Sequence, residues 1–71
     1  MNRQPVQSSN IASIGYDKES KTLEIEFLNG GIYQYNDVSE NIYKRLMSAE
    51  SKGKFFITRI RNNPSYAYRK V

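Results

Sequence analysis

The 71-residue sequence contains no cysteine and no histidine, and these two absences exclude several kinds of site. Without cysteine the chain can form neither a disulfide framework nor a thiolate zinc site. Without histidine it lacks the commonest metal ligand and the usual general base of catalysis. We therefore expect no catalytic residue, no metal and no cofactor, and we expect a reducing, cytoplasmic setting.

Long apolar runs are also missing. No stretch approaches the roughly 18 consecutive apolar residues that can cross a bilayer, and the segment Met1–Pro5 lacks the apolar run of a signal peptide. We expect no membrane partner. The length allows one domain at most. We expect residues 10–71 to form it, after a polar, disordered arm at residues 1–9.

Acidic residues are scarce in the C-terminal part of the chain. Residues 44–71 contain eight lysines and arginines against a single acid, Glu50, whereas residues 1–43 contain three basic residues against six acidic ones. The net charge of +4 is therefore concentrated in the second part, where a basic face could attract a polyanion. The alternative is a solvated surface that keeps a small domain soluble.

Alternation of side chains predicts two strands in the first part of the chain. The first, Asn10–Tyr16, places Ala12, Ile14 and Tyr16 together on one face. The second, Thr22–Leu28, is expected to bury Leu23, Ile25 and Phe27 and to expose Glu24 and Glu26. Without a third ligand, these two carboxylates do not make a metal site.

The strongest turn signal is Asn29-Gly30-Gly31, and it leaves two hairpins open. With a two-residue loop, Tyr33 and Tyr35 would lie opposite the glutamates of the preceding strand, on its exposed face. With a three-residue loop, whose last glycine is left-handed, Tyr33 would lie opposite Phe27 and Tyr35 opposite Ile25, on the core face. We favour the three-residue loop, because a domain this small can hardly leave two tyrosine rings exposed.

Helical spacing of apolar residues predicts a helix over about residues 39–50, which Asp37 or Ser39 can cap. Gly53 is expected to end it in a left-handed conformation. A second, short helix is predicted over about residues 52–61, with Ser51 as its cap and a strand as the alternative.

The end of the chain completes the predicted fold. Residues 62–65 break the second helix, and Tyr66–Val71 reads either as a short strand or as a loose basic and aromatic tail. The predicted class is α+β: a three-stranded antiparallel meander followed by two short helices, with a short C-terminal fourth strand as an option.

Basic and aromatic side chains supply the candidate binding residues. Phosphate contacts are assigned to Lys52, Lys54, Arg59, Arg61 and Arg69. Stacking on unpaired bases is assigned to Tyr33, Tyr35, Tyr66 and Tyr68. For the first two tyrosines, packing in the core is the alternative.

The chain resembles the KTSC domain, a family that occurs at the C-terminus of some lysyl-tRNA synthetases and as a small stand-alone protein in bacteria and phages. The resemblance covers about residues 10–66 and depends most on Tyr33-x-Tyr35 and on Ser51-x-Gly53 followed by aromatic residues. It departs at Ser39, where the family often has proline; both residues suit the start of a helix. Other matching positions are Ile14-Gly15-Tyr16, Leu23-x-Ile25-x-Phe27, Gly30, Val38, Tyr43, Leu46, Ala49 and Ile60.

Two functions follow from the sequence as hypotheses. The first is a non-catalytic module that binds RNA through the basic C-terminal part, which the synthetase context of the resemblance also implies. The second is a protein-interaction module or phage accessory protein, which would use an open sheet edge and a tyrosine-rich surface.

Overall fold

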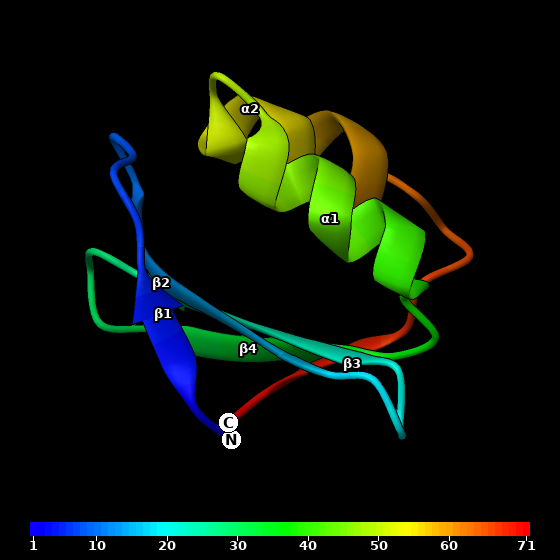
Figure 1. Cartoon of the computed structure of the whole chain (residues 1–71). Helices are drawn as coiled ribbons and strands as arrows, with labels where there is room; N and C mark the ends of the chain where they lie inside the picture. Colours follow the sequence, from blue (N-terminus) through cyan, green and yellow to red (C-terminus); the bar gives the residue numbers. More distant parts are fainter.

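A five-stranded antiparallel sheet and two helices make up the fold in the computed structural model, which describes all residues 1–71. The strands lie in the order β1-β2-β3-β4-β5, and the helices are inserted between β4 and β5. Both helices lie on one face of the sheet, and the other face has no helix (Figure 1). The bounds are β1 Arg3–Pro5, β2 Ile11–Asp17, β3 Thr22–Phe27, β4 Ile32–Tyr35, α1 Glu40–Ser48, α2 Lys52–Phe56, a π-helical turn η1 Ile57–Arg61, and β5 Tyr68–Lys70.

Two edge strands extend the predicted three-stranded meander. β1 pairs with β2, with Arg3 opposite Gly15, so residues 3–5 are part of the sheet and the predicted disordered arm is wrong there. Gly15 allows this approach, because a Cβ atom at that position would lie 2.8 Å from the backbone oxygen of Asn2. At the other edge, β5 pairs with β4, which confirms the optional C-terminal strand.

A bulge in β2 changes which of its side chains reach the core. Ile11 pairs with Phe27, but Ser13 already pairs with Glu26, so β2 has one residue more than β3 between these pairs. Ile11 and Ile14 are consequently both buried. The predicted strand was correct, but its simple alternation of faces was not.

The β3–β4 hairpin has a three-residue loop, as predicted, but the loop lies one residue earlier in the chain. Residues 28–30 form it, and the amide of Phe27 donates to the carbonyl of Gly31 at 2.8 Å. Gly30, not Gly31, adopts positive φ, at 95°. Tyr33 therefore lies opposite Ile25, with Tyr35 opposite Leu23. The tyrosines are on the core side, as predicted, with a register two residues away from the predicted one.

Both helices begin where the sequence predicts. The hydroxyl of Ser39 accepts a hydrogen bond from the amide of Ile42 at 3.3 Å, and that of Ser51 accepts one from Lys54 at 3.3 Å. Gly53 does not end α1, which ends at the cap Ala49; it lies inside α2, where an added Cβ atom would lie 2.4 Å from Oδ1 of Asn10. Neither helix has the length and apolar character needed to span a bilayer.

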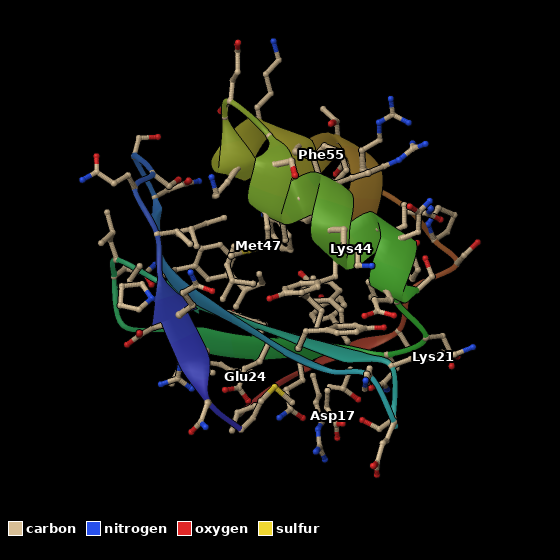
Figure 2. The ribbon with its side chains drawn as sticks, viewed as in Figure 1. Asp17, Lys21, Glu24, Lys44, Met47 and Phe55 are labelled. Atoms are coloured by element: carbon tan, nitrogen blue, oxygen red, sulfur yellow. The ribbon has the colours of Figure 1, made fainter.

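The core lies between the helices and the sheet. Figure 2 shows Met47 pointing from α1 into this space. Tyr16 of β2 stacks on Tyr43 of α1 with ring centroids 4.7 Å apart, and its hydroxyl donates to the carbonyl of Val38. The buried apolar residues are Ile11, Ile14, Leu23, Ile25, Tyr35, Val38, Leu46, Phe56 and Ile60.

Polar side chains are linked across the sheet face that lies away from the helices. Arg3 of β1 forms an ion pair with Glu24 of β3. Gln34 of β4 donates to the other oxygen of the Glu24 carboxylate at 2.7 Å, and Arg69 of β5 donates to Oε1 of Gln34 at 2.9 Å. We call these four residues the outer-face network; it connects both edge strands to the centre of the sheet.

Glu24 is buried, although the sequence predicted a solvated side chain. It is 5% exposed and lies on the side of the sheet away from the helices (Figure 2). Burial would raise the pKa of its carboxyl, but the hydrogen bonds from Gln34 and Arg3 and the positive charge of Arg3 hold that pKa below its usual value. The neighbouring glutamate, Glu26, accepts a hydrogen bond from Ser13 at 2.8 Å.

Candidate functional site

A pocket of about 280 Å³ lies where the end of η1 meets β4 and β5. We call it the tyrosine pocket; it is lined by Tyr33, Tyr35, Arg61, Asn62 and Tyr68. Tyr33 and Tyr35 are two residues apart in β4, and Tyr35 lies opposite Tyr68 of β5, so all three rings share the helix side of the sheet. Arg61 is the last residue of η1 and Asn62 its C-cap, so the helical segment supplies the remaining wall.

The three tyrosine rings of the pocket differ in exposure. Tyr35 is 4% exposed and packs edge-on against Phe56, with centroids 5.3 Å apart. Tyr68 is 63% exposed; it stacks on Tyr35 at 5.4 Å and 26°, and it is tilted by 51° against Tyr33 at 6.1 Å. The buried ring therefore fixes the position of an exposed one, which is the arrangement of an accessible stacking surface.

The charge at this pocket is positive. Burial raises the pKa of the Tyr35 hydroxyl, and the nearby positive charge of Arg61 partly opposes that rise. Both ion pairs of the chain are formed by Arg3, so Arg61 has no carboxylate partner. The acidic residues of β3 do not neutralise this charge, because the side chains of Glu24 and Glu26 lie on the other face of the sheet, where they accept hydrogen bonds from Gln34 and Ser13. A guanidinium in this position can receive an anionic group.

The structure brings together four of the nine residues that the sequence proposed as binding residues: Tyr33, Tyr35, Arg61 and Tyr68. Tyr66 is not among them; it is half-buried and packs against the core. Arg69 is also separate, because its guanidinium lies in the outer-face network on Gln34.

The remaining three predicted residues belong to α2 and η1. Lys54 and Arg59 line a more open hollow of about 430 Å³ between the end of α1 and α2, together with Glu50. The ammonium of Lys52 lies 3.4 Å from the carbonyl of Ala49 at the end of α1. Because η1 continues α2, these cations and Arg61 follow one helical segment toward the tyrosine pocket.

One residue of the pocket, Asn62, and one cation on the same face of the sheet, Lys70, are not among the residues that the sequence proposed. The sequence predicts Asn62 only as part of the segment that breaks the second helix, yet this residue lines the pocket. Lys70 lies opposite Tyr33 in the β4–β5 pair, so it shares the helix side of the sheet. For Asn62, only its place directly after Arg61 could have served as a signal.

The π-helical turn helps to place the arginine. The amide of Asn62 donates to the carbonyl of Ile57, five residues earlier, at 3.1 Å, and the turn ends there. π-helical turns are rare in proteins, and those that are found often lie at functional sites. No group of three carboxylates lies close enough together to hold a metal ion.

Comparisons with known proteins agree on one family. Residues 7–70 match the KTSC domain. The structure is similar to the crystal structure of a KTSC domain protein from Yersinia pestis, with 47% identity and a TM-score of 0.93 over 99% of this chain and 96% of that one. An uncharacterized protein of Stutzerimonas stutzeri is 41% identical over 56 residues, 79% of each chain. A lysine–tRNA ligase of Nostoc punctiforme is 36% identical over 50 residues, 70% of this chain but 9% of the ligase. The chain belongs to the KTSC domain family.

Proposed function

We propose that this domain is a non-catalytic module that binds single-stranded RNA at the tyrosine pocket and along the adjoining basic helical segment. The observation that carries the proposal is the pocket itself: an exposed tyrosine ring beside an arginine without a carboxylate partner. Aromatic rings that stack on unpaired bases and cations that contact phosphates are the usual elements of single-strand recognition.

Phosphate contacts are assigned to Lys52, Lys54, Arg59 and Arg61, which lie in α2 and η1. Arg69 is omitted, since its guanidinium is bound to Gln34 on the opposite face. No acidic residue follows Glu50 in the sequence, so no carboxylate of α2, η1 or β5 opposes the attraction of a polyanion to these four cations.

The relatives give this proposal a context. One relative is named as a lysine–tRNA ligase, and we propose that the shared domain contributes RNA affinity in both proteins. We further propose that this domain acts in a stand-alone form, because the relative from S. stutzeri is matched over 79% of its own length. We also propose that it acts in the cytoplasm.

Salt dependence tests the phosphate contacts. Fluorescence anisotropy with a labelled single-stranded RNA of about 12 nucleotides would be measured from about 50 to 200 mM salt. Four phosphate contacts predict a slope of about −3 in log affinity against log salt, which is a loss of roughly 50-fold across that range. Binding that is absent at low salt, or that does not change with salt, would contradict the proposal.

Two double variants separate these cations from net charge. Lys54→Gln with Arg59→Gln removes two of the assigned contacts, and we expect the slope to become shallower by about 1.4. The control, Lys18→Gln with Lys21→Gln, removes the same charge from exposed positions at the turn between β2 and β3. An equal effect of both pairs would show that only the overall charge matters.

A second candidate function is protein binding at the β5 edge. All three residues of β5 are exposed, and the strand has a neighbour on one side only. An extended peptide could add to this edge by main-chain hydrogen bonds. A pulldown with and without nuclease distinguishes the two functions, because a direct protein partner is retained after the RNA is digested.

A further inference from the structure

We infer that the tyrosine pocket receives one unpaired base of the RNA, stacked on Tyr68, and that this pocket makes the domain prefer single strands over duplexes. The inference rests on the proposed function. It adds a defined subsite to what is otherwise a charge-driven interaction.

The volume of the pocket limits what can enter it. At about 280 Å³ it is just below the roughly 300–1,000 Å³ of small-molecule sites, so it has room for one ring system and not for a base pair. In a duplex the faces of each base are covered by its neighbours, and the pocket cannot reach them. A base in a single strand can turn out of the chain at much lower cost.

The stacking surface is already in place before a ligand binds. Tyr68 is held by its contact with Tyr35, which is 4% exposed and itself packs on Phe56. A row of packed rings therefore connects the exposed ring to the core. Stacking on a pre-positioned ring requires little additional ordering, which favours binding.

The polar groups around the rings match a nucleotide. Asn62 offers both donor and acceptor atoms, which suit the edge of a base. Arg61 lies at the same pocket without a carboxylate partner and suits the phosphate next to that base. Lys70 does not line the pocket, but it lies opposite Tyr33 on the same side of β5 as Tyr68. An acidic peptide without aromatic residues would satisfy the cations, but it would leave the row of rings without a planar partner.

Substitutions at Tyr68 test the subsite, with Leu28 as the matched control. Both side chains are exposed, at 63% and 61%, and Leu28 lies in the β3–β4 loop. Anisotropy would be measured with a single-stranded RNA of about 12 nucleotides and with a duplex of the same length. The RNA would contain one 2-aminopurine, whose fluorescence reports stacking of that base.

Loss of the ring should affect only the single strand. We expect Tyr68→Ala to weaken single-strand binding by roughly 5- to 150-fold, the range for one stacked base, with the salt slope and duplex binding unchanged. Tyr68→Phe keeps the ring and should stay within about twofold of the unchanged protein, as should Leu28→Ala. The 2-aminopurine signal should be quenched by the unchanged protein and by Tyr68→Phe, but not by Tyr68→Ala.

Other outcomes would overturn the inference. Equal affinity of Tyr68→Ala and Leu28→Ala for the single strand would refute the subsite while RNA binding itself stands. The same holds if the unchanged protein binds duplex as tightly as single strand. If the unchanged protein binds neither RNA at low salt, the proposed function and the inference both fail. Thermal unfolding of each variant shows whether a loss of binding is a loss of fold.

Discussion

Replacement of Gly15 by alanine tests whether β1 lies against β2 as the structure describes. An added Cβ atom would lie 2.8 Å from the backbone oxygen of Asn2, 3.0 Å from Cγ of Arg3 and 3.3 Å from Cγ of Met1. The closest of these is a backbone atom, which cannot rotate away as the end of a side chain can. The strand β1 must therefore move as a whole.

The expected magnitude is the difference between two effects. Overpacking of this kind costs about 1–3 kcal/mol, whereas alanine in place of glycine inside a strand gains roughly 0.5–1 kcal/mol. We expect a net destabilisation of about 1 kcal/mol, within a range of about 0–2.5 kcal/mol, against a total stability of only about 3–5 kcal/mol for a domain of this size. The melting temperature should fall by several degrees, since about 1 kcal/mol corresponds to 4–8 °C here.

The assay is urea unfolding of both proteins, followed by hydrogen exchange of the strand amides. Displacement of β1 should also weaken the pair between Arg3 and Glu24, so protection should be lost in β1 and along the edge of β2 that faces it. If Gly15→Ala is more stable than the unchanged protein, or if β1 keeps its protection in the variant, the close approach of β1 is refuted.

Two further predictions concern the network and the hairpin. Glu24 has a lowered pKa in the folded state, so the stability that its carboxylate contributes is present above its ordinary pKa of about 4.5 and is lost as the pH falls through the folded value. The difference in unfolding free energy between the unchanged protein and Glu24→Gln should therefore be largest near neutral pH and shrink in acid. A difference that does not depend on pH would contradict this. Gly30→Ala should destabilise the fold by about 1 kcal/mol, because residue 30 has a φ of 95° that a side chain disfavours, while no atom lies within 4 Å of the added Cβ. Urea unfolding measures this change in stability, and a neutral effect would argue against the left-handed turn.

The central elements of the fold were predictable because their signals are local. Alternation in Thr22–Phe27 and the caps at Ser39 and Ser51 predicted one strand and two helix starts correctly. The family was also recognisable, because its motif residues include some in these segments and the Tyr33-x-Tyr35 pair in β4.

The errors share a physical cause, since each depends on a partner distant in the chain. β1 carries no apolar pattern; it is held by pairing with β2 and by the ion pair of Arg3 with Glu24, 21 residues away. The hairpin register was missed because Gly30 and Gly31 are equally permissive, and only packing selects between them. The bulge in β2 likewise leaves no local signal.

The candidate site was predicted in part. Three tyrosines and Arg61 were named from residue type, but their convergence depends on the pairing of Tyr35 with Tyr68. The same pairing turns Arg69 to the other face, which no property of the residue itself would predict. Composition thus supplied the candidate residues, whereas topology decides which of them lie together.

The position of β5 at the end of the chain has a consequence for the order of folding. The β2–β3–β4 meander joins residues close in sequence, but β5 must return to β4 across the whole helical segment, with Tyr33 opposite Lys70. Closing so large a loop makes late docking of β5 the expected order, and a three-residue strand with every residue exposed is also expected to open first. The tyrosine pocket therefore exists only once the last strand has docked. A base bound in the pocket would lengthen the time that β5 stays docked on β4. Hydrogen exchange of the β5 amides should therefore slow in the presence of RNA by a larger factor than that of any other amide.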